Sequence, residues 1–365
     1  MRPLRIAILA PLKVSTIGGA QRHVSSVQAI LTSLGHQVVL FSEDMPGKPS
    51  RVEALLACVL PSAKGAAFAR RFSPFPHFKD FDLVLSFDLA GVGVKHPTHL
   101  RILAGSYVPF RNQALKPVAG LAAIKRRLWT KAFYLLEKAA TQGKPALACS
   151  LGLRDDLKAV GLPVREEVIF PPVPAPETLE NKAFAKHAAG LKGTGPCLMF
   201  AGRWEYAKGS DRLEALILGL PSHWEVILAV PNPESVPARV KQRCGFVGAI
   251  APGVMPTFYR AADVTILPTR FEGSSVCLAE SLLCNTPVIT TPTGSGKDLA
   301  SNPLLKQCVV TEPDRPEVLL AAVRQFEDKT FYAAAVVQGR EFAERYYGLP
   351  VIAKQWESLL EALLK

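Results

Sequence analysis

Short apolar runs alternate with amphipathic stretches along this chain, a pattern typical of parallel β-sheets covered by helices. An apolar run at residues 5–10 is followed by an amphipathic stretch at 20–33, then Gly35, and a second apolar run at 37–41. Glycine directly after an amphipathic stretch is a common helix end. The segment therefore predicts a strand, a helix and a second strand, joined by a right-handed parallel crossover.

The same alternation continues in both halves of the chain. Further strands are predicted at 83–87, 102–104, 147–149, 168–170, 197–201, 224–230, 244–247, 264–267, 287–290 and 308–310. Between the halves, the prolines Pro171, Pro172, Pro174 and Pro176 exclude regular structure and indicate a linker. The length of 365 residues suits two domains at about 150 residues each.

We therefore predict an α/β protein with two Rossmann-like, doubly wound domains that face each other across a cleft. The first domain is expected to span residues 1–165 and the second residues 166–345. A C-terminal helix at about 346–365 is expected to pack back onto the first domain.

The net charge of +12 is concentrated in the first half. Residues 1–165 carry 23 Lys and Arg against 9 Asp and Glu, whereas residues 166–365 carry 20 against 22. This asymmetry indicates that the first half meets something anionic: nucleic acid, an acidic lipid surface or a phosphorylated substrate.

Composition narrows the class of protein. A hydrophobic fraction of 48% excludes wholesale disorder, and no run approaches the roughly 18 apolar residues of a transmembrane helix. The apolar run at 6–12 is interrupted by Pro11 and lacks a small-residue cleavage site, so no signal peptide is expected. The seven cysteines are scattered without C-x-x-C spacing, which favours a reducing cytoplasm over disulfides or a zinc site.

Three groups of residues follow predicted strands and suit an anionic or hydroxyl-rich ligand. Gly18-Gly19 precedes the first predicted helix, where backbone amides and the helix dipole favour a phosphate. Arg203 and Lys208 follow the strand at 197–201, and two cations at this spacing suit a diphosphate. A tight turn and a pair of solvated cations are the simpler readings of these two groups.

The third group follows the strand at 264–267. Ser274 or Ser275 is predicted to cap a helix, with Glu272 just before that helix and Glu280 in its second turn. Each carboxylate suits sugar hydroxyls, and the amides of Gly273, Ser274 and Ser275 suit a phosphate. Two exposed glutamates on a surface helix are the simpler reading.

In combination, these residues resemble the donor half of the retaining glycosyltransferases of family 4, which have the two-domain GT-B fold. The resemblance is carried by residues 200–203, 208–209, 259–264, 272–280 and 287–290, and by 18–23 and 35–38 near the start. Within the family, residues 18–22, 136–139, 142–144 and 170–172 are most similar to bacterial lipopolysaccharide core glucosyltransferases.

The resemblance implies a role for each residue. Arg203 and Lys208 would bind the donor diphosphate, Glu280 the ribose hydroxyls, and Glu272 the donor sugar, beside the amides of Gly273, Ser274 and Ser275. Gly18 and Gly19 would close over the phosphates. Many members have a histidine after the strand that matches 100–104; here that place reads Ala104-Gly105-Ser106, and Asp88, His96 and His99 cannot be aligned to it. A front-face retaining mechanism would still operate, with the leaving phosphate taking the acceptor proton.

Residues 111–144 form a basic stretch in which apolar and aromatic residues recur at helical spacing. Glu137 is its only acid. A basic amphipathic helix of this kind binds an anionic membrane surface, whereas a core-packed helix with a solvated basic face is the commoner outcome. We expect peripheral attachment to the cytoplasmic leaflet.

The sequence thus predicts a retaining glycosyltransferase that moves a sugar from a UDP-, GDP- or ADP-sugar to a glycan or glycolipid such as lipopolysaccharide core. No metal, cofactor or nucleic-acid partner is expected; Asp80-Phe81-Asp82 precedes its strand, and Gly294 to Asp298 matches a P-loop poorly. A GT-B nucleotide-sugar epimerase and a basic nucleic-acid-binding protein are the alternatives, and a missing glycine fingerprint disfavours a dehydrogenase.

Overall fold

The computed structural model describes residues 2–16, 18–46, 48–59, 61–72, 75–141, 144–191 and 195–364. Gln142 and Gly143, which contribute to the resemblance above, lie outside the described residues. The chain divides into two compact units. The first consists of Met1–Asn112, Pro117–Pro172 and Leu349–Lys365, and the second of Gln113–Lys116 and Val173–Gly348.

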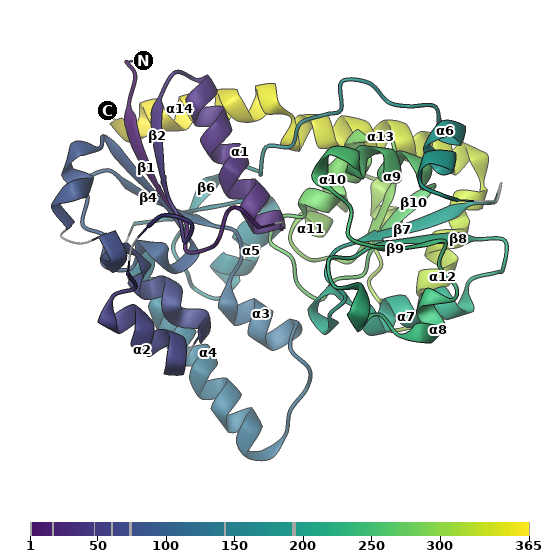
Figure 1. Cartoon of the computed structure of the whole chain (residues 1–365), viewed down its shortest axis with the longest axis horizontal. Coiled ribbons are helices and arrows are strands. Elements are labelled where there is room, and N and C mark those ends of the chain that lie inside the picture. Colours follow the sequence, from purple (N-terminus) through teal and green to yellow (C-terminus); the bar gives the residue numbers. More distant parts are fainter. Residues whose placement is uncertain are drawn as a thin grey trace. The chain divides into compact units, whose positions relative to one another are not determined.

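The first unit contains a six-stranded parallel sheet in the order β2-β1-β3-β4-β5-β6 (Figure 1). Its strands are β1 (Arg5–Leu9), β2 (Gln37–Phe41), β3 (Leu83–Phe87), β4 (His99–Leu103), β5 (Ala146–Ala148) and β6 (Val164–Val168). Its α-helices are α1 (Gly19–Ser33), α2 (Arg51–Val59), α3 (Tyr107–Gln113), α4 (Gly120–Thr141), α5 (Leu151–Ala159) and α14 (Leu349–Leu364). Short 3₁₀ helices lie at η1 (Pro61–Phe72), η2 (Phe75–Asp80) and η3 (Asp88–Gly91).

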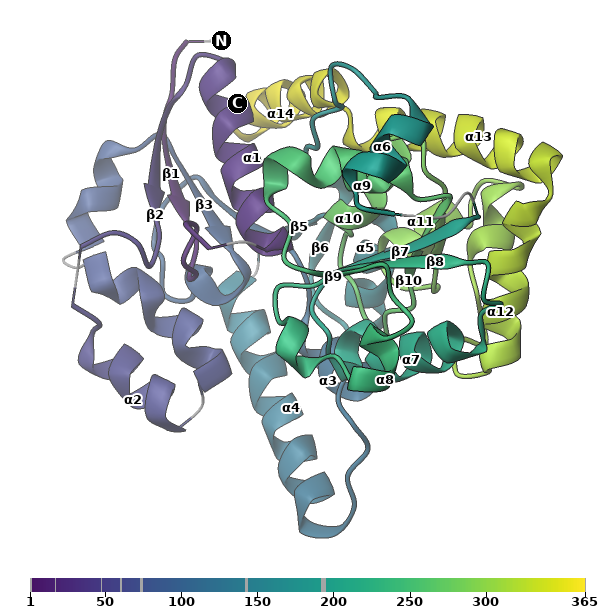
Figure 2. The same ribbon diagram turned by 45° about the vertical axis from the view of Figure 1, so that its right-hand side comes forward.

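The second unit contains a five-stranded parallel sheet in the order β11-β10-β7-β8-β9 (Figure 2). Its strands are β7 (Cys197–Ala201), β8 (Glu225–Ala229), β9 (Phe246–Gly248), β10 (Val264–Leu267) and β11 (Val288–Thr290). Its α-helices are α6 (Lys182–Ala188), α7 (Ser210–Gly219), α8 (Ala238–Lys241), α9 (Met255–Ala261), α10 (Val276–Leu283), α11 (Ser295–Leu299), α12 (Pro316–Arg324) and α13 (Lys329–Tyr347). The 3₁₀ helices are η4 (Tyr206–Lys208), η5 (Pro233–Ser235), η6 (Pro252–Val254), η7 (Leu305–Cys308) and η8 (Gln325–Glu327).

The two predicted parallel α/β folds are confirmed, because local patterning decides most of their elements. All five residues of β3 and of β7 are buried, as expected of strands covered on both faces. Helix α1 buries Val24, Val27 and Leu31 at helical spacing, and Gly35 follows it at φ +87°. Within the first unit, α14 packs against α1.

The structure differs most from the strand predictions at two places. The strand predicted at 308–310 is wrong, because Leu305–Cys308 forms a 3₁₀ turn and Val309 makes only an isolated bridge to Thr290. The strand predicted at 168–170 begins instead at Val164. It includes the polar and largely exposed residues Glu166 and Glu167 because β6 lies at the edge of its sheet, where burial is not required.

Strand order locates the sheet edge where a ligand is expected in each unit. In open parallel sheets, ligands bind beyond the carboxyl ends of the strands, where the strand order reverses. In the first unit this point lies between β1 and β3, and in the second unit between β7 and β10.

No helix in the described part of the chain is both long and apolar enough to cross a membrane. All seven cysteines are free thiols. The described residues include no group of three or more His, Cys, Asp or Glu side chains arranged to hold a metal ion.

Candidate donor-sugar site

In the second sheet, the strand order reverses between β7 and β10, and an ion pair joins the two segments that follow these strands. Lys208 lies in η4, after β7, and Glu272 lies in the loop after β10. The Lys208 Nζ atom is 2.6 Å from Glu272 Oε2, and the two side chains are 27% and 21% exposed. Burial disfavours the charged lysine, but the carboxylate of Glu272 outweighs it and raises the pKa of Lys208. Lys208 is therefore charged, and both side chains of the pair are partly exposed to solvent.

Glycine and arginine hold the two loops together. Gly209, at φ +76°, lies against Pro268, the first residue after β10. A Cβ added at Gly209 would be 2.1 Å from the carbonyl oxygen of Pro268. A side chain at this position would push Lys208 away from Glu272. The main-chain amide of Arg270 also donates to the carbonyl of Ala207 at 2.9 Å. This close approach makes Gly209 part of the site geometry.

Arg270 is a residue that sequence reasoning missed. Its guanidinium lies 3.6 Å from the ring centroid of Tyr206 and donates to the Tyr206 carbonyl at 2.8 Å. It also binds both carboxylate oxygens of Asp211, at 2.7 and 2.8 Å. Its side chain is 7% exposed. Arg270 therefore fastens the loop that carries Lys208 to the loop that carries Glu272, through contacts about 60 residues apart that no local motif announces.

Glu280 lies in the second turn of α10, as predicted, and is held by Tyr259. The Tyr259 hydroxyl donates to Glu280 Oε2 at 3.1 Å, and Tyr259 is completely buried. Burial, together with nearby Cys277 and Glu280, raises the pKa of Tyr259 well above its ordinary value, so the phenol stays a donor. Sequence reasoning included Tyr259 in the resemblance but gave it no role.

The amino end of α10 is capped by Ser275, whose hydroxyl accepts from the Leu278 amide at 3.3 Å. The expectation that all three amides of Gly273, Ser274 and Ser275 suit a phosphate needs correction. The Ser275 amide already donates to the buried hydroxyl of Ser295 at 3.0 Å. The Ser274 hydroxyl lies 3.2 Å from that of Tyr347.

The stretch from Gly294 to Asp298, which matches a P-loop poorly, packs against this same turn. Gly294 has φ +48°, and a Cβ there would lie 2.2 Å from the carbonyl oxygen of Gly273. Only glycine permits that approach. Gly294 and Ser295 therefore shape the turn that carries Glu272 and Gly273.

The remaining predicted residues lie as follows. Arg203 is on the loop after β7, 66% exposed, with its guanidinium 3.0 Å from Glu205 Oε1. Gly18 and Gly19 lie in the first unit at the amino end of α1, where Gly18 is the N-cap residue and makes no side-chain cap hydrogen bond. Their contact with donor phosphates stays a prediction. Asp82, just before β3, forms an ion pair: its carboxylate lies 2.6 Å from Arg2 Nη2 and accepts from the Arg5 amide.

The part of the chain that contains this site is similar to known proteins. The family model described as "Glycosyl transferases group 1" matches residues 195–328. The D-inositol 3-phosphate glycosyltransferase of Xylanimonas cellulosilytica is 28% identical over 140 residues, which are 35% of this chain and 33% of that protein. The lipopolysaccharide core biosynthesis mannosyltransferase LpsB of Rhizobium meliloti is 24% identical over 200 residues, 51% of this chain and 57% of that protein. The matches thus span between a third and three fifths of these relatives.

Solved structures are similar over nearly the whole chain. Sucrose-phosphate synthase from Thermosynechococcus elongatus superimposes with a TM-score of 0.79 at 18% identity, covering 99% of both chains. The glycosyltransferase WaaG, involved in lipopolysaccharide biosynthesis, has a TM-score of 0.71 at 17% identity, covering 96% of this chain and 99% of its own. Anabaena Alr3699/HepE, solved with UDP-glucose, has a TM-score of 0.69 at 13% identity, covering 98% of this chain and all of its own. At these identities the likeness concerns the fold.

The family match covers the site built above, since Arg203, Lys208, Glu272 and Glu280 all lie within residues 195–328. Residues 195–328 of the second unit thus match the group 1 glycosyltransferase model, and the chain has the GT-B fold that the resemblance to family 4 implies.

Proposed function

We propose that this protein is a retaining glycosyltransferase that moves a sugar from a nucleotide diphosphate to a glycan or glycolipid of the lipopolysaccharide core type. The observation that carries the proposal is the Lys208–Glu272 ion pair beyond the carboxyl ends of β7 and β10, with Glu280 held nearby by Tyr259. The family match and the relatives named above support it.

In this proposal the ion pair opens when the donor binds. The diphosphate takes the place of Glu272 beside Lys208, and Arg203 leaves Glu205 to bind the same group. The released carboxylate of Glu272 then accepts hydrogen bonds from the donor sugar. Glu280 binds the ribose hydroxyls, because Tyr259 holds one of its oxygens and fixes its direction.

The cations act mainly on the transition state. As the bond from the anomeric carbon to the diphosphate breaks, negative charge grows on the leaving oxygen. Lys208 and Arg203 stabilise that charge more strongly than the charge of the intact donor. On the front-face path, the leaving phosphate takes the proton of the acceptor hydroxyl, and the configuration at the anomeric carbon is retained.

The donor is tested by thermal shift with UDP-, GDP- and ADP-sugars on the wild-type protein and on Lys208→Ala. One nucleotide series should raise the melting temperature of the wild type and raise that of the variant much less. A matched control is Lys186→Ala, which removes a cation paired with Asp263 at 3.1 Å in the same unit. The proposal is wrong if no nucleotide sugar shifts the wild type.

A membrane surface is the second part of the proposal, and α4 carries it. Its residues Leu121, Ile124, Leu128 and Leu135 follow one face and are exposed, Leu121 by 86% and Leu128 by 65%. The amino-terminal part of the helix extends beyond the other helices of the first unit (Figures 1 and 2). Exposed apolar residues that follow one face of a helix are unusual on a surface that contacts only water.

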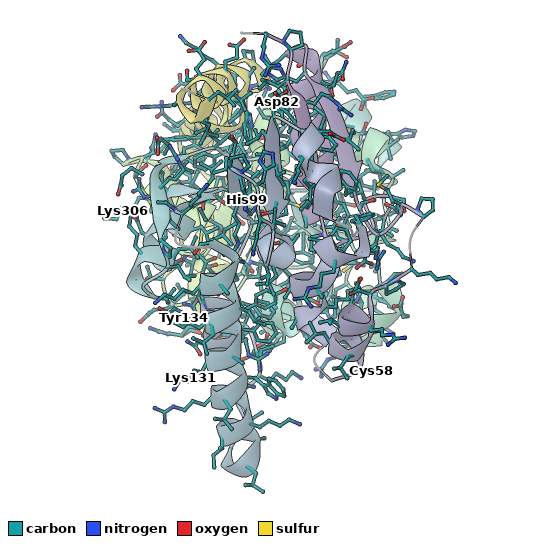
Figure 3. The ribbon with its side chains drawn as sticks, turned by 90° about the vertical axis from the view of Figure 1, so that its left-hand side faces the viewer. Cys58, Asp82, His99, Lys131, Tyr134 and Lys306 are labelled. Atoms are coloured by element: carbon teal, nitrogen blue, oxygen red, sulfur yellow. The ribbon has the colours of Figure 1, made fainter. Side chains whose placement is uncertain are left out.

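Cations lie beside this apolar face. Lys125, Arg126, Arg127, Lys131 and Lys138 are all at least partly exposed, and Figure 3 labels Lys131 one turn from Tyr134. A cavity of about 770 Å³ adjoins the helix, and its lining combines the cations Arg126, Arg127 and Lys131 with both apolar and uncharged polar side chains. Such a surface suits the anionic lipids of a cytoplasmic leaflet and a glycolipid acceptor that lies within that leaflet.

Vesicle flotation tests this part. The protein should float with phosphatidylglycerol vesicles at low salt and much less with phosphatidylcholine alone. Leu121→Ser with Leu128→Ser should abolish flotation, whereas Phe184→Ser, at an apolar residue that is 59% exposed in the second unit, should leave it unchanged. Equal flotation of wild type and the α4 variant would contradict the membrane role.

A further inference from the structure

Asp88, in the first unit, has a backbone conformation that calls for an explanation. Two non-glycine residues among those described have a left-handed φ: Asp88 at +50° and Asn285 at +57°. Asn285 follows the end of α10, where such a residue commonly terminates a helix. Asp88 instead follows β3 directly and begins η3, so no helix end accounts for it. A strained residue of this kind costs on the order of 1 kcal/mol and is often found at a functional site.

A buried charged group holds this conformation in place. Arg101 on β4, 3% exposed, donates from Nε to the carbonyl oxygen of Asp88 at 2.5 Å and from Nη1 to the carbonyl oxygen of Glu137. Glu137, 1% exposed, accepts from the Ser106 hydroxyl and the Tyr107 amide, both at 3.0 Å. Buried charges of this kind contribute little net stability, so specific positioning is the better reason for them.

The side chain of Asp88 lies where the sheet is expected to meet a ligand. Strand β3 flanks the reversal point of the first sheet, and Asp88 is the first residue beyond its carboxyl end. Its Oδ1 accepts from the Ala104 amide at 3.1 Å, just beyond the carboxyl end of β4. The residue stays partly exposed, unlike Phe87 and Leu89 beside it. The fold thus presents one fixed carboxylate at this edge.

We propose that Asp88 binds a hydroxyl group of the acceptor sugar. This inference rests on the proposed function and adds a recognition residue in the first unit. A carboxylate whose backbone and side chain are already held in place accepts a sugar hydroxyl with little loss of conformational freedom.

The charged surroundings of Asp88 agree with this role. The partial burial of Asp88 raises the pKa of its carboxyl, and Arg101 and the amides of Ala104 and Gly105 lower that pKa by less. Glu137 and Tyr107 also interact electrostatically with this carboxyl. Binding through the ionised form weakens as the pH falls toward that raised pKa.

The test uses substitutions that the backbone accepts. Asp88→Gly suits φ +50° and keeps the carbonyl that Arg101 binds, but lacks the carboxylate. Asp88→Asn also tolerates this φ and keeps an oxygen for the Ala104 amide, but lacks the charge. Asn285→Gly is the matched control, because it changes the other left-handed residue.

Three quantities are measured on each purified full-length variant: melting temperature, its shift with the nucleotide sugar that stabilises the wild type, and calorimetric binding of delipidated lipopolysaccharide core oligosaccharide without donor. Both Asp88 variants should keep the melting temperature and the donor shift but bind the oligosaccharide about 10- to 100-fold more weakly. Asn285→Gly should match the wild type in all three.

Oligosaccharide binding by Asp88→Gly that equals the wild type would overturn the inference, and so would a wild type that does not bind it. A lower melting temperature in both Asp88 variants would also overturn it, because Asp88 would then be structural. A further result is possible, in which no nucleotide sugar shifts the melting temperature but oligosaccharide binding still depends on Asp88. That result would count against the glycosyltransferase proposal and support the acceptor site.

Discussion

The charged side chains near the carboxyl ends of the strands differ in exposure between the two sheets. In the second unit, Lys208 and Glu272 form a partly exposed pair on loops that directly follow β7 and β10. In the first unit, Arg101 and Glu137 are almost fully buried and come from separate elements, with Asp88 as their partly exposed neighbour.

This difference in exposure determines whether the charged groups at each sheet edge are able to exchange partners with a ligand. A solvent-exposed ion pair contributes little stability and exchanges readily for a ligand of higher charge, which suits a diphosphate that arrives and leaves. A buried charged group cannot exchange without leaving an uncompensated charge, so it serves as a fixed support. The second unit thus presents an exchangeable site and the first unit a rigid one.

The largest expected effect tests the exchangeable site. Lys208→Ala, Arg203→Ala and Glu280→Ala should each lower turnover by about 10²- to 10³-fold, because each removes a contact proposed for the donor. Circular dichroism and melting curves should show a folded protein. Lys186→Ala, which removes an ion pair elsewhere in the same unit, should retain turnover per folded molecule. Full activity of all three site variants would disprove the site.

A smaller effect is expected from the residue that aligns the two loops. Arg270→Lys keeps the charge but loses the paired contact with Asp211 and the planar stacking on Tyr206. Turnover should fall about 10-fold, with a smaller change in the KM for donor, because Lys208 and Glu272 are displaced rather than removed.

Arg239→Lys is the control for Arg270, since Arg239 forms an exposed pair with Glu214 and should behave as the wild type. If Arg270→Lys lowers the melting temperature while turnover per folded molecule is unchanged, Arg270 stabilises the unit without positioning the site.

The smallest effect concerns the stability of the first unit toward acid. Burial lowers the pKa of His23, which packs edge-on against Phe87, to about 4. The unfolded chain therefore binds a proton at higher pH than the folded one. The stability from this histidine is complete above about pH 6.5 and is lost as the pH falls toward 4, by on the order of 1–3 kcal/mol.

Hydrogen exchange at pH 7.5 and pH 5 should detect this loss in the amides of β1 and β3. His23→Phe, which cannot be protonated, should reduce the difference between the two pH values. An equal loss of protection in wild type and variant would assign the acid sensitivity to other groups.

Much of the site in the second unit was predictable from the sequence, because its residues belong to short segments whose structure depends on neighbouring residues. The strand at 264–267, the cap at Ser275 and the eight-residue separation of Glu272 from Glu280 depend on neighbouring residues alone. Helical and strand periodicity then place these residues on known sides of an element. The strand predicted at 308–310 failed because a short apolar run becomes a strand only if a partner pairs with it along its length.

What the sequence determined by itself was the succession of strands and helices, the division into two α/β units and the residues around Lys208, Glu272 and Glu280. Only the tertiary structure decided that Arg270 joins two loops, that Ser295 occupies the Ser275 amide, and that Arg101 holds Asp88 in a left-handed conformation. The physical reason is range: patterning acts over one or two turns, whereas these contacts join residues that are distant in the chain and meet only when the sheets form.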